Sequence, residues 1–311
     1  MKLGIDPGKF RTKAVTMING EWVKFDVRSK IMLNPISIMA GDNYLIGYDE
    51  QKFLIGEGAN DYSLDTDKQS LQHKLCTYLA INRLAQETPV ELVVGCPFSL
   101  FKKADKREAY WDYIKGDEII RLDVNDDESI INIADGTAFA ECGGIAYAEP
   151  DEDFEDSTRG VVDIGGLNVN GCVFENLSPV LGTDFTENLG SIIFQNNLKQ
   201  ELNKEYPEIN LQDYDMKNVI RRGLVIDGKK ELKANKIIDE SLGNHFDCII
   251  KVLKKKNWSV RTLDITVSGG GSLDIGIDII QRYIPQAKLS NDPVWDNAKG
   301  FYYVAEMLFK G

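Results

Sequence analysis

The sequence predicts an α/β protein of two domains, with mixed sheets covered by helices. At 311 residues the chain is longer than a single hydrophobic core usually supports. Apolar strand-like runs alternate with segments of helical periodicity, a pattern typical of wound sheets with helices on their faces. A third observation is that an apolar strand ending in Asp and turning at glycine occurs in each half, at Asp6 and again at Asp163.

The composition is that of an ordinary globular protein with an acidic balance. Lys and Arg number 36 against 49 Asp and Glu, so the formal net charge is −13, which argues against a general affinity for DNA or anionic membranes. The five cysteines form no CxxC pair and there are two histidines, which predicts reduced, mostly buried thiols and no zinc site. No apolar run approaches the roughly 18 residues of a membrane span. We therefore expect a cytoplasmic protein that neither crosses a membrane nor binds nucleic acid directly.

The first hairpin, residues 3–17, is the segment most suited to chemistry. An apolar strand leads to Asp6, turns at Gly8 and returns with Lys13. Gly8 can adopt the positive φ of a tight turn, so the amides after it can face an anion. Asp6 ends a buried strand that has no structural need for a carboxylate, and it suits an acceptor for the water molecules of a bound Mg²⁺. Because an isolated Asp-x-Gly is more often a plain turn, the second copy at 160–174 carries the argument.

The rest of the first half reads as strands followed by helices. Asn19-Gly20 between apolar runs is a strong hairpin signal. Apolar spacing predicts a helix over 70–84, and a buried strand over 90–95 is expected to stop at Pro97. The remaining expected elements are further short strands up to residue 55, an amphipathic polar stretch at 102–114 and a hairpin at 119–133.

The middle of the chain contains the expected domain crossing. Residues 135–147 are rich in alanine and glycine, and this composition predicts a helix whose face can approach another backbone closely. The acidic run 149–157 is expected to be a solvated loop between the domains. We place the first domain at residues 1–155 together with a C-terminal helix over 292–311, and the second domain at residues 156–291.

The second half repeats the hairpin and then becomes mainly helical. Apolar periodicity predicts an amphipathic helix over 237–255, whereas 207–232 is less regular. A buried strand over 263–268 runs into Gly269-Gly270-Gly271-Ser272, and glycines between a strand and a helix indicate a backbone that approaches a ligand. The remaining expected elements are strands at 177–181 and 287–289, and helices at 186–202, 273–283 and 294–309.

The ordered set of features resembles the actin, Hsp70 and sugar-kinase superfamily. Three motifs carry the resemblance: Asp6-x-Gly8 with Lys13 for the first phosphate hairpin, Asp163-x-Gly165-Gly166 for the second, and Ser268-Gly-Gly-Gly-Ser272 for the adenosine motif. Residues 136–147 and 297–302 lie where the two domain-connecting helices belong. The resemblance covers nearly the whole chain. It implies an actin-like (ribonuclease H-like) two-domain α/β fold with mixed sheets and a nucleotide in the inter-domain cleft.

Within that superfamily the chain is most similar to bacterial actin-like plasmid-segregation proteins of the ParM type. Chain length, the run at 93–103, and Asn188-Leu-Gly-Ser191 before a long helix carry this closer resemblance. It implies an ATPase, with GTP as the alternative nucleotide, that assembles with itself into filaments and disassembles after hydrolysis. It also implies a DNA-binding adaptor protein of the ParR type as the partner in segregating plasmid DNA.

The resemblance further assigns roles to individual residues. Asp6 and Asp163 would hold Mg²⁺ through its water molecules, and Glu141, on the connecting helix, would orient or deprotonate the attacking water. Lys13 would neutralise phosphate oxygens. The other nucleotide-binding candidates are Gly8, Lys9, Gly165, Gly166 and Asn168 for the phosphates, Gln195 and Lys199 for the ribose, and Gly269, Gly270 and Gly271 for the base and ribose.

The second hairpin departs from the family pattern. Where the family commonly has Gly-Gly-Thr-Thr and a further Asp, this chain has Gly166-Leu167-Asn168 and Asn170. The loss of hydroxyls and of a carboxylate could slow hydrolysis, with Asn168 as a substitute donor. The altered hairpin leaves open a static scaffold that binds nucleotide without turning it over. A second alternative is a small-molecule kinase of the same superfamily, for which no substrate-binding insertion is evident.

Candidate polymer contacts are apolar residues just after a strand end. Phe98, Leu100 and Phe101 are the first candidates, with 33–39 and 41–67 behind them. The aromatic residues expected in the core instead are Phe301, Tyr302, Tyr303 and Phe309.

Overall fold

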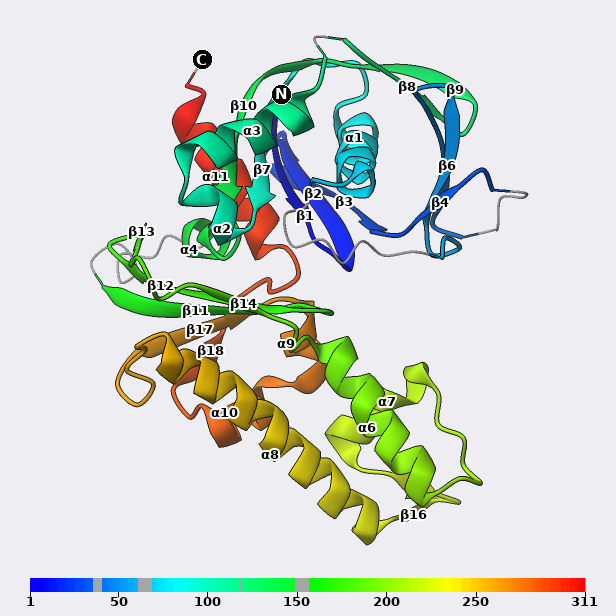
Figure 1. Ribbon diagram of the computed structural model, residues 1–311, viewed down its shortest axis with the longest axis vertical. Coiled ribbons are helices and arrows are strands. Elements are labelled where there is room, and N and C mark those ends of the chain that lie inside the picture. The colour runs from blue at the N-terminus through cyan, green and yellow to red at the C-terminus, as the bar shows by residue number, and fades with distance from the viewer. Residues whose placement is uncertain (36–40, 61–68, 118, 149–156, 311) are drawn as a thin grey trace. The chain divides into compact units, whose positions relative to one another are not determined.

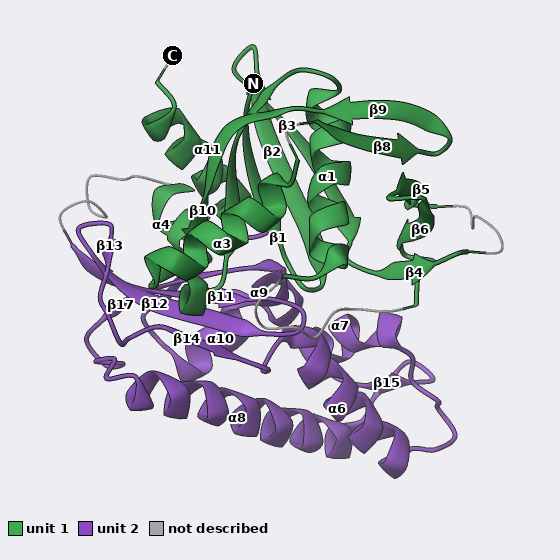
Figure 2. Ribbon diagram, turned by 45° about the horizontal axis from the view of Figure 1, so that its top comes forward, with its two compact units in different colours: residues 1–150, 295–311 green, residues 151–294 purple. Residues whose placement is uncertain are grey.

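The computed structural model describes residues 1–35, 41–60, 69–117, 119–148 and 157–310. The chain divides into two compact units, shown in Figures 1 and 2. Unit 1 comprises residues 1–150 and 295–311, and unit 2 comprises residues 151–294. The expected boundary at 155–156 falls in the segment 149–156, outside the described residues.

Unit 1 contains two five-stranded sheets. The first has the order β10-β7-β1-β2-β3, in which β1, β7 and β10 run parallel and β1, β2 and β3 pair antiparallel. The second, of order β4-β6-β5-β8-β9, is antiparallel. The strands are β1 (Lys2–Pro7), β2 (Arg11–Ile18), β3 (Glu21–Arg28), β4 (Ile31–Leu33), β5 (Asn43–Tyr48), β6 (Gln51–Gly56), β7 (Val90–Cys96), β8 (Ile120–Val124), β9 (Asp127–Ile131) and β10 (Ile133–Ala140). The mixed first sheet is the one that the sequence predicts.

Helix α1 (Leu71–Ala85) is the centre of the larger core of unit 1. The predicted helix over 70–84 is confirmed within one residue at each end: it begins after the N-cap Ser70, and most of its residues are buried. Figure 1 shows it between the strands of the two sheets, and its apolar residues join side chains of both in one cluster. The other helices of this unit are α2 (Phe98–Phe101), α3 (Ala104–Lys115), α4 (Gly143–Ala148) and α11 (Asp296–Leu308).

Helix α11 packs backbone to backbone on β1 and α4. A Cβ atom at Gly300 would lie 1.7 Å from the carbonyl oxygen of Gly144, and one at Gly4 would lie 2.0 Å from that of Ala298. Only glycine permits such approaches. The predicted close approach of the 135–147 segment is therefore confirmed for its helical part, and Phe301 and Tyr302 are buried as expected.

The prediction of a helix over 135–147 is wrong for its first half. Residues 133–140 form β10, which pairs in parallel with β7, so the sheet overrides the helix preference of the alanines. A Cβ atom at Gly136 would lie 2.2 Å from the Trp111 ring, so this glycine makes room for α3 over the strand. The helix starts only at Gly143.

Unit 2 has one mixed sheet of order β13-β12-β11-β17-β18, with β14 beside β12. Strands β11, β17 and β18 are parallel, and β12 is antiparallel to β11. The elements are β11 (Thr158–Ile164), β12 (Val169–Glu175), β13 (Ser178–Pro179), β14 (Phe185–Glu187), β15 (Val225–Ile226), β16 (Lys229–Lys230), β17 (Asp264–Ser268), β18 (Ala287–Leu289), α6 (Ser191–Glu205), α7 (Asp213–Arg222), α8 (Leu232–Lys255), α9 (Gly270–Ile275) and α10 (Ile277–Tyr283).

Several elements of unit 2 differ from the predictions. Helix α8 begins at Leu232 rather than at 237. Helix α6 begins at Ser191 rather than at 186, because residues 185–187 pair with β12. The segment 207–232 contains α7, which starts with a capping box formed by Gln212 and Asp215. The predicted helix over 273–283 is two helices, separated at Gly276, whose φ is +100°.

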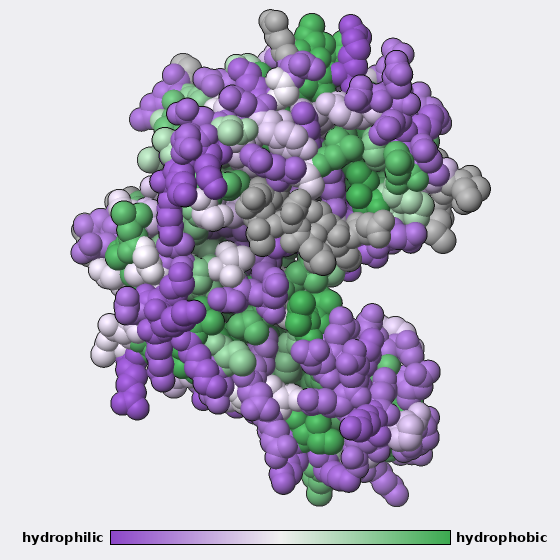
Figure 3. Space-filling view, in the orientation of Figure 1, coloured by the Kyte–Doolittle hydropathy of each residue, from purple (hydrophilic) through white to green (hydrophobic). Residues whose placement is uncertain are grey.

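Two of the predicted polymer contacts are wrong. Phe98 and Leu100 are 5% and 4% exposed. Leu100 packs in the larger core of unit 1, and the ring of Phe98 lies against that of Phe101, with centroids 6.3 Å apart. Leu33 is 52% exposed, whereas residues 36–40 and 61–68 of the other candidate stretches lie outside the described residues. Hydrophilic side chains dominate the visible faces of both units in Figure 3.

Two further predictions made from the composition concern the cysteine thiols and membrane-spanning segments. Four of the five cysteines are buried, as predicted, and Cys248 is exposed. Within the described ranges, none of the helices has the length and apolar character to cross a membrane.

We expect Gly300→Ala to destabilise unit 1 by about 2 kcal/mol or more, because the new methyl group overlaps the backbone of α4. Gly243→Ala in α8 is the matched control. A Cβ atom at Gly243 meets nothing closer than the Tyr283 hydroxyl at 4.0 Å, so this change should stabilise the helix by about 0.5–1 kcal/mol. Thermal and urea unfolding of the two variants measures the difference, and equal effects would contradict the packing described.

A second prediction concerns His245 of α8, which lies against Phe194 with ring centroids 4.8 Å apart. Its Nε2 atom is buried without a hydrogen-bond partner among the described residues, and burial lowers the pKa of His245 from 6.5 to about 4. Between these values the unfolded chain binds a proton that the folded chain does not. The stability of unit 2 should therefore fall as the pH drops from about 6.5 towards 4, and His245→Leu should reduce this loss. Unfolding midpoints at pH 7.5 and pH 5 provide the measurement; the same slope in both proteins would refute it.

Candidate functional site

The first hairpin places a carboxylate and an ammonium group opposite each other. Asp6 of β1 and Lys13 of β2 are direct partners in the antiparallel register. Asp6 is 7% exposed and Lys9 is 6% exposed. Neither Asp6 nor Lys13 forms an ion pair with another described residue. A nearly buried carboxylate without a cation is costly, so this position is suited to a bound cation.

Gly8 is required at the turn for a reason other than the predicted one. Its φ is not positive. Instead, a Cβ atom at Gly8 would lie 2.4 Å from the carbonyl oxygen of Arg11. The amide of Gly8 donates to the carbonyl oxygen of Asp6 over 2.9 Å. The expectation of an unusual backbone angle is thus wrong, while the need for glycine stands because the turn is tight.

Ser29 stabilises this turn by hydrogen bonds to its backbone, a role that the sequence does not predict. It is fully buried. Its hydroxyl donates to the carbonyl oxygen of Gly8 over 2.6 Å, and its amide donates to that of Phe10 over 3.2 Å. Ser29 is distant from the turn in sequence, and no sequence pattern marks it.

Charged side chains join the same turn to the second sheet of unit 1. Arg11 and Arg28 both contact the Glu57 carboxylate, at 3.1 and 2.6 Å, and Arg11 also pairs with Asp26. Burial by itself would raise the pKa of Glu57, but Arg28 and Arg11 together lower it. Glu57 directly follows β6, so the turn and the second sheet share one ionic cluster.

Glu141 does not lie on a helix, in contrast to the prediction. It is the first residue after β10, and its amide donates to the carbonyl oxygen of Cys96, at the end of β7, over 2.9 Å. Glu141 is 5% exposed. Burial raises the pKa of Tyr110 well above its ordinary value, and negative charge on Cys96, Glu141 and Asp6 raises it further. Glu141 and Asp6 therefore both lie near this phenol, at one end of the first sheet.

The second hairpin, in unit 2, places Asp163 at the end of β11. Asp163 is the register partner of Asn170 in β12 and of Ser268 in β17. The turn is closed by the Gly165 amide, which donates to the carbonyl oxygen of Asn168 over 2.9 Å. The Asn168 side-chain amide donates to Oδ1 of Asn170 over 3.1 Å. The two asparagines that distinguish this hairpin thus bind each other.

The triple glycine packs against the second hairpin. A Cβ atom at Gly269, whose φ is +87°, would lie 2.2 Å from Oδ1 of Asp163. One at Gly271 would lie 2.6 Å from the carbonyl oxygen of Gly165, whereas one at Gly270 would meet nothing within 4 Å. The structure thus gives the three glycines different roles: Gly269 and Gly271 permit packing, and Gly270 faces open space.

Helix α6 is attached to the same hairpin. The amides of Ser191 and Ile192 donate to the carbonyl oxygens of Gly165 and Gly166 over 3.0 and 2.9 Å. Of the two predicted ribose contacts on this helix, Gln195 is 8% exposed. Lys199 forms an ion pair with Asp213 of α7.

Asp274 is a further polar residue beside this motif that sequence reasoning missed. It accepts a hydrogen bond from the Ser191 hydroxyl over 3.4 Å and pairs with Lys217 over 3.2 Å. The signal is weak, because α9 is short and Lys217 lies in a segment without regular periodicity.

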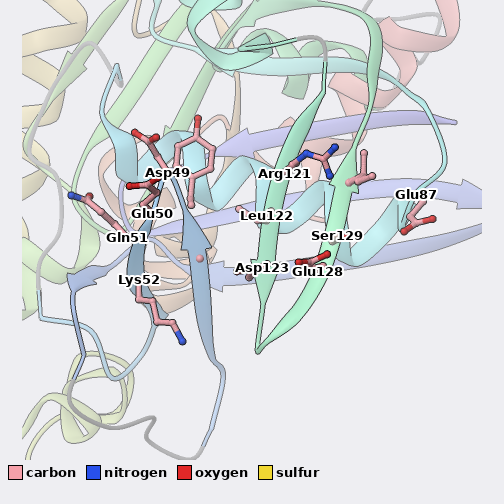
Figure 4. A pocket seen from close by; sticks show the side chains of 13 residues that line it. Asp49, Glu50, Gln51, Lys52, Glu87, Arg121, Leu122, Asp123, Glu128 and Ser129 are labelled. Atoms are coloured by element: carbon pink, nitrogen blue, oxygen red, sulfur yellow. The ribbon is translucent and has the colours of Figure 1, made fainter.

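A separate hollow of about 510 Å³ lies on the second sheet of unit 1 (Figure 4). Side chains of both charges line it, among them Glu50, Arg121 and Glu128. None of the predicted site residues takes part. Throughout the described ranges, no group of three or more His, Cys, Asp or Glu residues is arranged to hold a metal ion.

Comparison with known proteins shows which of them share this fold. Residues 4–144 match the family model for the N-terminal domain of actin-like proteins. The chain is similar over 98% of its length, and 98% of the other chain, to the Alp12 filament structure, with 25% identity and a TM-score of 0.71. An archaeal actin homologue, Ta0583, in complex with ADP matches at 17% identity over 98% and 99% of the two chains, with a TM-score of 0.73.

A 15-stranded ParM filament from Clostridium botulinum matches over 99% of each chain, with 18% identity and a TM-score of 0.72. No curated protein sequence matches the chain. The chain therefore has the actin-like fold. The solved structures that share this fold include filament-forming proteins of the Alp12 and ParM type.

We expect Gly269→Ala to destabilise unit 2 by about 2 kcal/mol, because alanine is strained at this φ and its methyl group would overlap Asp163. Gly270→Ala, one residue later, has open space and should change the unfolding free energy by less than about 0.5 kcal/mol. Urea unfolding followed by the fluorescence of Trp258, the buried tryptophan of unit 2, compares the two. Equal losses would show that the triple glycine is not divided in this way.

Proposed function

We propose that this protein binds ATP or GTP with Mg²⁺, assembles with itself into filaments in that state, and hydrolyses the nucleotide in the filament. The observation that carries the proposal is Asp6: a nearly buried carboxylate at a strand end, opposite Lys13, without an ion-pair partner among the described residues. The filament structures of Alp12 and ParM, with the same fold, support self-assembly.

Both hairpins contain residue types that suit the phosphates and the cation. Asp6 in unit 1 and Asp163 in unit 2 would hold Mg²⁺ through its water molecules. The ion supplies neutralisation of charge on the phosphate oxygens. The residue types fit, since carboxylates are the ligands that Mg²⁺ prefers. Lys13 and Lys9 add positive charge from the first hairpin, and Gly8, Gly165, Gly166 and Asn168 would contact the phosphates through their turns.

The base and ribose are assigned to unit 2. Gly270 is open to a ligand, whereas Gly269 and Gly271 shape the backbone around it. Gln195 is kept as a ribose contact, near the hairpin end of α6. Lys199 is the weaker candidate because its ammonium group is paired with Asp213.

Glu141 is assigned to the attacking water. Its carboxylate is nearly buried and lies in the same part of unit 1 as Asp6. A carboxylate there can accept the proton of a water molecule or align its lone pair, whereas the neighbouring phenol of Tyr110 stays protonated and cannot. Hydrolysis therefore depends on Glu141.

We propose that the filament segregates plasmid DNA in the cytoplasm of the cell. A DNA-binding adaptor of the ParR type would connect the filament to DNA, because the net charge of −13 disfavours direct binding. The second candidate, a static nucleotide-binding scaffold, is favoured by the hydrogen bond between Asn168 and Asn170, where the family has hydroxyls and a carboxylate. Single-turnover hydrolysis separates the two.

We expect light scattering to rise when ATP or GTP with Mg²⁺ is added to the protein, and to decay as phosphate is released. Glu141→Gln should slow phosphate release about 10²-fold and prolong the scattering plateau, with nucleotide binding unchanged. Electron microscopy with ATP, GTP and a non-hydrolysable analogue identifies the assembled form.

Lys251→Gln, on the exposed face of α8, is the control and should hydrolyse at the normal rate. Absence of assembly with every nucleotide would refute the filament proposal. Unchanged phosphate release in Glu141→Gln would refute the role of Glu141.

A further inference from the structure

We propose that Tyr110 of α3 is the positioning residue for Glu141, and that its hydroxyl does this by fixing the end of β7. The inference rests on the proposed role of Glu141 in hydrolysis. It adds a residue outside every predicted motif to that reaction.

Two successive carbonyl groups at the end of β7 carry the connection. The Tyr110 hydroxyl donates to the carbonyl oxygen of Gly95 over 3.1 Å. The next carbonyl, that of Cys96, accepts the Glu141 amide over 2.9 Å. Tyr110 and Glu141 are thus attached to adjacent peptide groups, and a shift of one peptide moves the other.

Gly95 lies just beyond the ladder that β7 makes with β1. The paired residues of that ladder end at Ile5 and Val94. Pro7, the last residue of β1, has no amide hydrogen with which to continue it. The Tyr110 hydroxyl therefore supplies a donor beyond the point where β1 stops supplying one, although β7 still pairs with β10 there. It does so inside the protein, since Tyr110 is fully buried.

The other side of this peptide is also fixed. A Cβ atom at Gly95 would lie 2.7 Å from the Phe301 ring of α11 and 3.5 Å from Pro7. The strand end is thus held between α11 and the Tyr110 hydroxyl. Removal of the Tyr110 hydroxyl leaves the steric contact of Gly95 with α11 but removes the hydrogen bond to the Gly95 carbonyl group.

A phenol suits this position because it remains a neutral donor. Asp6 and Glu141 both lie close enough to raise the pKa of Tyr110, after burial as the main cause. The hydroxyl consequently keeps its proton throughout the working pH range. Its hydrogen bond to Gly95 does not depend on pH, and its role is geometric.

The test is Tyr110→Phe, which keeps the ring and removes only the hydroxyl. We expect kcat for nucleotide hydrolysis to fall about tenfold while KM for the nucleotide changes less than about twofold. Assembly with a non-hydrolysable nucleotide should remain. Tyr113→Phe, three residues along the same helix and partly exposed, is the matched control and should leave kcat and KM unchanged.

A double-mutant cycle shows whether the effect runs through Glu141. In the Glu141→Gln background, Tyr110→Phe should reduce hydrolysis less than about twofold further. Hydrogen exchange gives a readout that does not need activity: the Glu141 amide should exchange several-fold faster in Tyr110→Phe, and the Val93 amide, inside β7, should not. This measurement also serves if hydrolysis by the variant is too slow to follow.

The outcomes separate the two proposals. A tenfold loss in both backgrounds, or unchanged exchange at Glu141, would overturn the positioning role of Tyr110 while leaving that of Glu141. If Glu141→Gln itself hydrolyses normally, the role of Glu141 fails and that of Tyr110 fails with it.

Discussion

Direct contact between backbones is the constraint on which both units depend. In unit 1, α11 reaches β1 and α4 only because Gly4, Gly144 and Gly300 lack side chains. In unit 2, Gly269 and Gly271 allow the chain after β17 to lie against the second hairpin. Because protein interiors are close-packed, such contacts leave little freedom for the elements that they join. The two Asp residues at the ends of β1 and β11 are held by elements of this kind.

Much of the fold could be predicted because its signals are local. The two hairpins, α1 and α8 follow from turn residues and apolar spacing within a few positions. The strand β10 could not be predicted in this way, since its alanines favour a helix and only the ladder with β7 decides otherwise. Similarly, Phe98 and Leu100 look like surface residues after a strand until the direction of α2 is known.

The residues of the candidate site also differ in whether a local sequence signal marks them. Asp6, Lys13 and Asp163 stand out because each belongs to a short motif, and the structure adds their registers. Ser29, Tyr110 and Asp274 carry no motif, and each acts on a segment far away in sequence. Gly8 illustrates a mixed case, in which the residue type was predicted and its physical reason was not. Residues that hold a site are therefore harder to find from sequence than those that form it.

The supports of the first hairpin differ in how they respond to ionic strength. Glu57 is 45% exposed at its side chain, so its attraction to Arg11 and Arg28 is screened by dissolved salt. Ser29 is fully buried and its hydrogen bonds join uncharged groups, so salt hardly affects them. Concentrated salt consequently loosens the connection between the turn and the second sheet of unit 1, while the turn itself keeps its shape.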